Sequence, residues 1–259
     1  MFWRKRASID SEELEWFAAT WEWLDSINGP VDRAAPRQLI LPNRHYFPDP
    51  DTELEGHARA VHYFDKVKDY CRMTEWHCEI SPQAERLGLK ASAALGEMSS
   101  SGALGTYSRA GNTAVITYDP ELARADSPEQ LIATFAHELS HYRLENAIAP
   151  IPGGSDCAEL ATDLCTVHLG FGLFGANNAF VYKQTSSFDS QGWSYQRSGY
   201  LSEPMWTFAN AAFVELIGAP PEAYAEFAKY SIAAGMKKNR AYLKANPNII
   251  GGLRSSTNT

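Results

Sequence analysis

The stretch His137-Glu138-Leu139-Ser140-His141 is an HExxH motif within a segment of helical hydrophobic periodicity. Residues four apart share one face of an α-helix, so the two histidines can bind the same metal ion. The glutamate beside them can take a proton from a water molecule at that metal. With 7 His in 259 residues, such a string arises by chance in roughly one to two per cent of chains, so the surrounding sequence must decide.

The helix predicted over residues 128–146 separates its large apolar residues from its two histidines. On a helical wheel of about 100° per residue, the apolar side chains form one stripe, and His137 and His141 project from nearly the opposite side. The stripe consists of Leu131, Ile132, Phe135, Leu139 and Tyr142. This pattern predicts a helix between two layers that presents its histidines to a cleft. The alternative is an ordinary helix with two solvated histidines.

A catalytic zinc site normally has three protein ligands and one open position, so the motif needs a further ligand. The metzincin extension HExxHxxGxxH is absent, because Leu144 and Ala147 stand where its Gly and His would be. A loop rich in Pro and Gly leads instead to a second predicted helix over residues 157–170. Glu159 and Asp163 share one face of that helix, because they are four residues apart.

Glu159 is predicted to be the third metal ligand, contributed by a helix that folds back beside the first. Asp163 can then accept the free N–H of a ligating histidine and fix its orientation. The alternative is that Glu159 only closes a capping box with Asp156. His168 points about 180° away from Glu159 if the helix is continuous, so it is not assigned to the site.

HExxH followed by a helix that carries ExxxD resembles the gluzincin branch of the zincin metallopeptidases, as in thermolysin-like enzymes. The resemblance covers about residues 113–163. It implies that His137, His141 and Glu159 bind Zn²⁺ and that Asp163 supports a histidine. Phe47-Pro48-Asp49-Pro50 and Leu169-Gly170-Phe171-Gly172 are also similar to a group of uncharacterised bacterial proteins, a likeness that implies no activity.

Gluzincins also use a Tyr, His or Arg beyond the zinc helices to stabilise the oxyanion of the tetrahedral intermediate. No motif in this chain identifies that group. Tyr195, Arg197 and Tyr200 lie in a polar and aromatic stretch after the glutamate helix, and they are candidates by position. Each taken singly can equally be an ordinary loop residue.

The order of predicted elements indicates an α+β, zincin-like fold with the motif helix at the junction of two lobes. Residues 1–126 are predicted to form an α/β part with a small antiparallel sheet, and residues 127–250 a helical zinc-binding part. Residues 251–259 are predicted to be a disordered tail. The expected helices of the first part span 11–27 and 52–71, and its strands 76–80, 103–108 and 113–118. Those of the second part after the glutamate helix span 203–217, 221–232 and 234–245.

Composition excludes several other classes of protein. A formal net charge of −8 argues against nucleic acid as the main partner. The longest apolar stretch, residues 164–181, contains a histidine and three glycines, which favours a buried helix and its loop over a membrane span. No apolar run of signal-peptide type follows Met1, and 4 Cys do not suggest a disulfide scaffold. A cytoplasmic location is therefore expected.

Together these features predict a zinc-dependent hydrolase, most simply a metallopeptidase that acts on a peptide or protein. Glu138 would be the general base toward the water and would then protonate the leaving amine. The strand at 113–118 is expected to be the cleft edge that aligns an extended peptide. One alternative is a zinc-binding, zincin-like protein without turnover that acts as a binding or regulatory module. A zinc hydrolase of non-peptide amides also fits these residues.

Overall fold

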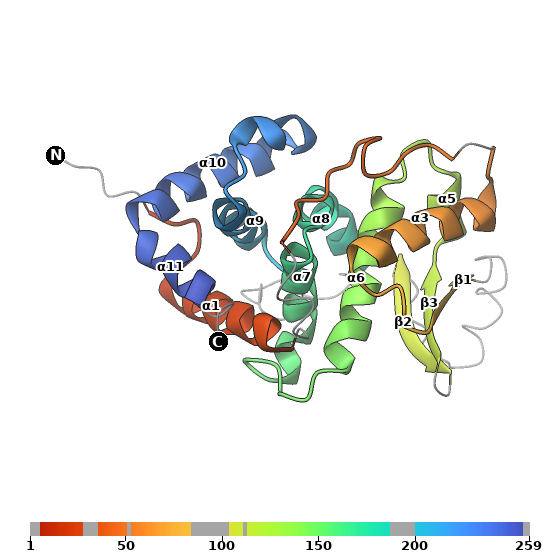
Figure 1. Ribbon diagram of the computed structural model, residues 1–259, viewed down its shortest axis with the longest axis horizontal. Coiled ribbons are helices and arrows are strands. Elements are labelled where there is room, and N and C mark those ends of the chain that lie inside the picture. The colour runs from red at the N-terminus through yellow and green to blue at the C-terminus, as the bar shows by residue number, and fades with distance from the viewer. Residues whose placement is uncertain are drawn as a thin grey trace.

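The computed structural model describes residues 6–27, 36–50, 53–83, 104–110, 113–186 and 200–255. Figure 1 shows a small sheet flanked by α3 and α6 at one end of the molecule and a group of helices at the other. The elements are α1 (Ser11–Ile27), α3 (Gly56–Tyr70), β1 (Cys78–Pro82), β2 (Gly105–Ala110), β3 (Thr113–Tyr118), α5 (Pro120–Arg124), α6 (Glu129–Glu145), α7 (Ala158–His168), α8 (Gly172–Ser186), α9 (Glu203–Ile217), α10 (Tyr230–Ala245) and α11 (Pro247–Ser255). The predicted α+β class is confirmed.

The sheet has the strand order β1-β3-β2, with β3 in the middle. β3 is parallel to β1 and antiparallel to β2, so the sheet is mixed and the prediction of an antiparallel sheet was wrong in part. β2 and β3 form a hairpin and must be antiparallel, whereas the long connection after β1 permits a parallel pairing. The prediction that residues 113–118 form the cleft edge was also wrong, because β3 has a partner on each side.

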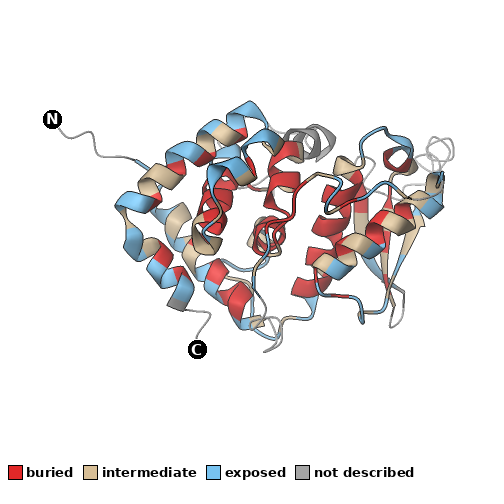
Figure 2. Ribbon diagram, turned by 45° about the horizontal axis from the view of Figure 1, so that its top comes forward, coloured by how far each residue is buried: buried red, intermediate tan, exposed pale blue. Residues whose placement is uncertain are grey.

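The helix α6 lies between two layers, as its wheel predicted. It contacts α3, β2 and β3 on one side and α7 and α8 on the other. All five residues of its apolar stripe belong to the core that α6 forms with α3 and the sheet. Figure 2 shows that α6, α7 and α9 are buried along most of their length, while α10 and α11 are exposed on one side. The apolar stripe thus turns the opposite face of α6 toward α7.

The N-terminal helix α1 packs with the helices of the other end of the molecule, against α7 and α11. Asp10 caps it reciprocally with Glu13: the N–H of Glu13 donates to Asp10 Oδ1 at 2.9 Å, and the N–H of Asp10 donates to Glu13 Oε2 at 2.9 Å. Phe17 and Trp21 are fully buried in this second core. Burial of such large rings against α7 explains the dense aromatic content of this helix.

Three sequence predictions fail in the helical part. The predicted tail begins inside α11, a helix from Pro247 to Ser255, where Ile250 and Leu253 are buried against the body. The predicted helix over 221–232 is replaced by two short 3₁₀ turns before α10. The apolar stretch 164–181 was expected to be a buried helix and its loop, but it spans parts of two helices, α7 and α8. Gly170 separates the two helices with a φ of +95°, and a Cβ there would lie 2.0 Å from the carbonyl oxygen of Gln38.

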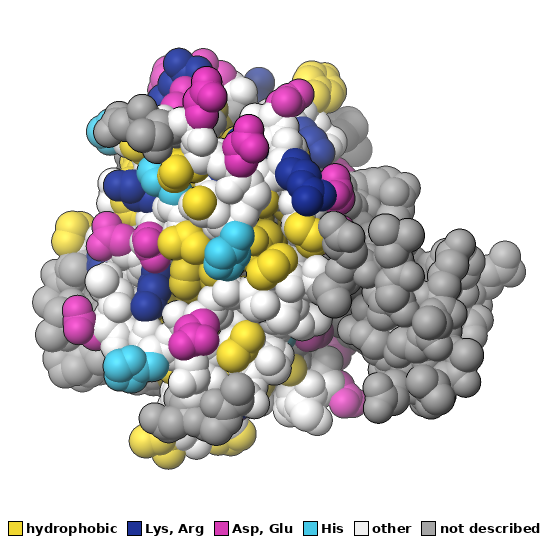
Figure 3. Space-filling view, turned by 90° about the vertical axis from the view of Figure 1, so that its right-hand side faces the viewer, with side chains coloured by type: hydrophobic (Ala, Val, Ile, Leu, Met, Phe, Trp, Pro, Cys, Tyr) yellow, Lys and Arg dark blue, Asp and Glu magenta, His cyan; other side chains and the backbone are white. Residues whose placement is uncertain are grey.

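The surface at the sheet end of the molecule mixes charges of both signs. Figure 3 shows this face, on which acidic, basic, histidine and hydrophobic side chains are interspersed. Within the ranges that the structure describes, no helix is both long and apolar enough to cross a membrane.

His168 joins α7 to α1 through a buried ion-pair cluster. Its Nε2 lies 2.7 Å from Asp25 Oδ1, and Arg37 binds the same carboxylate. Burial lowers the pKa of His168 below its ordinary value of 6.5. The hydrogen bond to Asp25 opposes this shift, and the positive charge of Arg37 lowers the pKa further. The histidine therefore stays neutral in the folded chain at a pH where the unfolded chain binds a proton.

This difference predicts a pH dependence of stability. Because the unfolded state takes up the proton first, the contribution of His168 is fully present above pH 6.5 and declines as the pH falls below it. We expect a loss of up to about 1.4 kcal/mol per pH unit in that window. Urea unfolding at pH 7.5 and 5.5 measures it, and a His168→Gln variant should show a shallower decline. Equal declines in both proteins would assign the effect to other groups.

Candidate metal centre

The facing sides of α6 and α7 bring His137, His141 and Glu159 to one point. The Nε2 atoms of the two histidines are 3.1 Å apart, and Glu159 Oε2 lies 3.4 Å from each of them. These three side chains form the one group of potential metal ligands that the described ranges contain, and they could hold a metal ion. The structure thus brings together all three residues that were predicted from the sequence to be metal ligands.

The size of this triangle fits a tetrahedral zinc ion. Zinc–nitrogen and zinc–oxygen bonds of about 2.0–2.1 Å at tetrahedral angles place neighbouring ligand atoms about 3.3 Å apart. The observed separations of 3.1, 3.4 and 3.4 Å lie close to this value. Glu159 Oε2 is also buried and makes no hydrogen bond to any described group. A buried carboxylate oxygen without a donor is costly unless a cation or a donor completes it.

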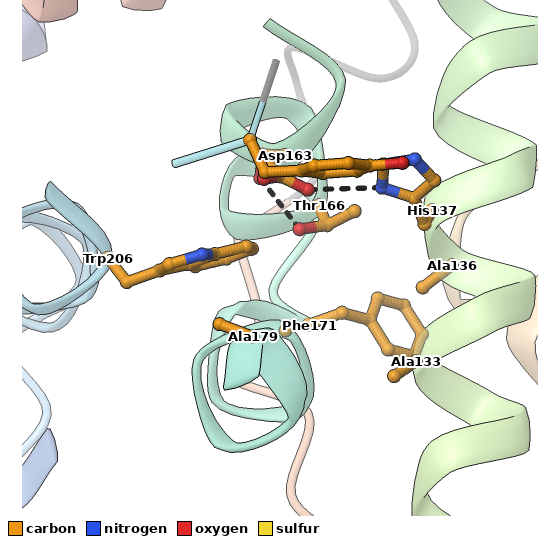
Figure 4. Close-up of a pocket in the computed structure, with 10 residues that line it drawn as sticks. Ala133, Ala136, His137, Asp163, Thr166, Phe171, Ala179 and Trp206 are labelled. Atoms are coloured by element: carbon orange, nitrogen blue, oxygen red, sulfur yellow. Dashed lines mark hydrogen bonds and ion pairs between the residues drawn. The ribbon is translucent and has the colours of Figure 1, made fainter. Parts of the chain in front are cut away.

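The other nitrogen of each imidazole faces α7. His137 Nδ1 lies 3.1 Å from Asp163 Oδ1, and His141 Nδ1 lies 3.3 Å from the hydroxyl of Thr162. Figure 4 shows His137 of α6 and Asp163 of α7 directed at one another. A histidine that donates from Nδ1 keeps the lone pair of Nε2 for a metal, which is the arrangement that metal-binding histidines usually have.

Asp163 is the acidic residue predicted to support a histidine, and it makes a second contact. Its Oδ2 accepts a hydrogen bond of 2.9 Å from the backbone N–H of Leu201, at the entry to α9. The side chain is almost fully buried. The capping alternative for Glu159 does not describe the structure: α7 begins after Cys157, and no side-chain hydrogen bond caps it there.

The carboxylates around His137 favour a positive charge on its imidazole. Burial alone would lower the pKa of His137, but Asp163 and Glu159 outweigh it and raise the pKa to about 10. Burial raises the pKa of Glu159, yet the two histidines lower it well below its ordinary range. A protonated His137 can donate from Nδ1 to Asp163 and from Nε2 into the centre of the triangle. The two carboxylates thus stabilise a positive charge at this point.

Glu138 lies near the two histidines of the motif and also approaches strand β2 at Gly105. Its carboxylate is buried and accepts a hydrogen bond from the backbone of Tyr107. Burial raises its pKa, and the nearby histidines His137 and His141 oppose that rise. A carboxylate whose pKa is raised in this way is suited to accept a proton from water and release it again.

Gly105 allows β2 to approach α6 this closely. A Cβ on Gly105 would lie 2.5 Å from Thr134 Cγ2, 3.0 Å from the Thr117 carbonyl oxygen and 3.1 Å from Glu138 Oε1. We expect Gly105→Ala to destabilise the fold by about 1–3 kcal/mol through overpacking. Chemical denaturation measures the change. Gly251→Ala is the matched control, because a Cβ there meets nothing within 4 Å; equal stability of both variants would contradict the close fit.

Of the three residues suggested as oxyanion donors, the structure describes Tyr200. Its ring centroid lies 5.9 Å from that of His137. Burial, followed by the charges of Glu159 and Asp163, raises the pKa of Tyr200, so the phenol stays protonated. Tyr195 and Arg197 lie outside the described residues.

A small cavity lies behind His137, between α6, α7, α8 and α9. Its volume of about 10 Å³ is about that needed for one water molecule. Figure 4 shows its lining of small and aromatic side chains, with Ala133 and Ala136 of α6 facing Ala179, Phe171 and Trp206. A substrate side chain would not fit this space without movement.

Sequence reasoning missed Thr162, Gly105 and the backbone of Tyr107. Thr162 could have been found, because it lies three residues after Glu159 and so shares its helix face. Gly105 and Tyr107 meet Glu138 only through the tertiary fold, and no local pattern signals them.

Comparisons with protein-family models, with curated proteins and with solved structures found no match.

Proposed function

We propose that this chain is a zinc-dependent hydrolase, most simply a metallopeptidase of the gluzincin type with a zincin-like fold. The observation that carries the proposal is the triangle of His137 Nε2, His141 Nε2 and Glu159 Oε2, whose sides of 3.1–3.4 Å match the spacing of three ligand atoms around a tetrahedral ion. The buried carboxylate of Glu138 next to the two histidines adds the base that hydrolysis needs.

The donor set favours zinc over other common metals. Two imidazole nitrogens and one carboxylate oxygen suit Zn²⁺, whereas Ca²⁺ and Mg²⁺ take mostly or only oxygen ligands in larger numbers. When bound, zinc would lower the pKa of a water molecule and polarise a substrate carbonyl.

The residues of the chain supply the remaining steps. Glu138 accepts the proton of the attacking water and delivers it to the leaving nitrogen as the bond to carbon breaks. Asp163 holds the His137 ring in place, and Tyr200 stands beside that ring with a protonated hydroxyl that can donate to a developing oxyanion.

The edge strand β2 is the element that would align an extended peptide. Among the described residues it pairs only with β3, and it packs against the motif helix, where the backbone of Tyr107 donates a hydrogen bond to Glu138. An extended substrate can add to such an edge through backbone hydrogen bonds. This role replaces the one expected for residues 113–118.

The proposal is tested by metal analysis followed by a broad peptide library. We expect about one zinc per chain, because three protein ligands converge on a single point. Cleavage should stop when a chelator removes the zinc and return when zinc is restored. Absence of zinc binding would refute the proposal. Bound zinc without cleavage of any peptide would favour the alternative, a binding or regulatory protein that retains the zincin-type site.

A further inference from the structure

One face of α7 meets both histidines of the motif. Glu159, Thr162 and Asp163 occupy positions i, i+3 and i+4 of the helix, so all three point toward α6. Glu159 contributes the ligand oxygen and Asp163 orients His137. The remaining member, Thr162, is 1% exposed and lies against the second histidine.

The hydroxyl of Thr162 has one proton to donate and two lone pairs to accept with. It donates to the backbone carbonyl of Ala158, one helical turn earlier, at 2.9 Å. Toward His141 Nδ1, at 3.3 Å, it can then only accept. This pattern places the proton of a neutral His141 on Nδ1, and the lone pair of its Nε2 is left to point at Glu159 and His137.

We propose that Thr162 is the positioning residue of His141, as Asp163 is of His137, and that it sets the tautomer and ring orientation in which His141 can bind a metal. This inference rests on the proposed metal site. The two partners differ in charge: a carboxylate makes His137 the more basic ligand, whereas a neutral hydroxyl fixes His141 without adding charge. The E-x-x-T-D face of α7 thereby supplies one ligand, Glu159, and one hydrogen-bond partner for each histidine of the H-E-x-x-H motif in α6.

The test compares three variants of the full-length protein. Thr162→Val keeps the shape and removes the hydroxyl, and Thr162→Ser keeps the hydroxyl. Thr166→Val is the matched control, because Thr166 is a buried threonine one turn later whose hydroxyl donates to the backbone carbonyl of Asp163 at 2.7 Å and, among the described residues, to no histidine. Zinc affinity is measured by competition with a chromophoric chelator.

We expect Thr162→Val to weaken zinc binding about 10–100-fold, as loss of an outer partner of a metal-binding histidine does. Thr162→Ser and Thr166→Val should bind zinc like the wild type. Equal weakening in Thr166→Val would show that any lost buried hydroxyl on α7 has this effect, and would overturn the positioning role.

The tautomer is read directly from long-range ¹H–¹⁵N spectra of metal-free protein labelled with ¹⁵N-histidine. We expect the Nδ1–H form at His141 in the wild type and in Thr162→Ser, and a loss of that preference in Thr162→Val. An Nε2–H form at His141 in the wild type would overturn the inference, even if the valine variant did not fold. These spectra need neither zinc nor turnover, so failure of the proposed enzyme function would remain distinguishable from failure of this inference.

Discussion

Replacement of Glu138 by glutamine is expected to lower the rate of peptide cleavage by about 10³-fold, within the range typical of a lost general base. Glutamine has nearly the same shape and its carbonyl oxygen can still accept the hydrogen bond that Glu138 receives from Tyr107. It cannot accept a proton from water. Zinc content should stay at the wild-type level, because Glu138 is not one of the three residues that converge on the metal point.

The measurement is the initial cleavage rate of one peptide taken from the library, together with the zinc content of each protein. Glu129→Gln is the matched control, since Glu129 begins the same helix α6, two turns before the motif. We expect that variant to cleave like the wild type. Equal rates for Glu138→Gln and the wild type would remove Glu138 from the mechanism, and a loss of zinc in Glu138→Gln would give it a structural role instead.

The features that local sequence predicts best are those with helical spacing. The wheel of residues 128–146 predicted a helix packed on both sides, and α6 has that environment. Such a prediction is dependable because an apolar stripe must be buried against another element in any fold that the chain adopts. The approach of Glu159 to the two histidines agrees with the general tendency of consecutive elements to pack together, because α6 and α7 follow one another in the chain and are in contact.

The predictions that failed depend on partners far away in sequence. Whether β3 is an edge or a central strand depends on where β1 docks, and no residue of β3 encodes that. Residues 251–259 were predicted to be disordered because they end the chain, yet Ile250 and Leu253 are buried against the body and residues up to Ser255 form part of α11. Tertiary burial overrides local propensity in both cases.

Substitution of Glu159 by glutamine is expected to weaken zinc binding by more than about 100-fold, beyond the range seen when only an outer partner of a ligand is lost. The change removes the negative charge of a ligand whose Oε2 is buried and lacks any other described donor. At a fixed concentration of free zinc, a 100-fold loss of affinity reduces the stabilisation by zinc by about 2.7 kcal/mol. The zinc-induced rise in melting temperature should therefore shrink or vanish.

Thermal unfolding with and without zinc, together with chelator competition, measures this effect. Asp156→Asn is the matched control: it removes one exposed carboxylate from the 3₁₀ turn that leads into α7 and touches neither histidine of the site. We expect Asp156→Asn to keep the full response to zinc. If Glu159→Gln responded to zinc as the wild type does, the third ligand would have to be another acidic group. Glu138 and Asp163 would then be the carboxylates to test, because both lie close enough to raise the pKa of His137.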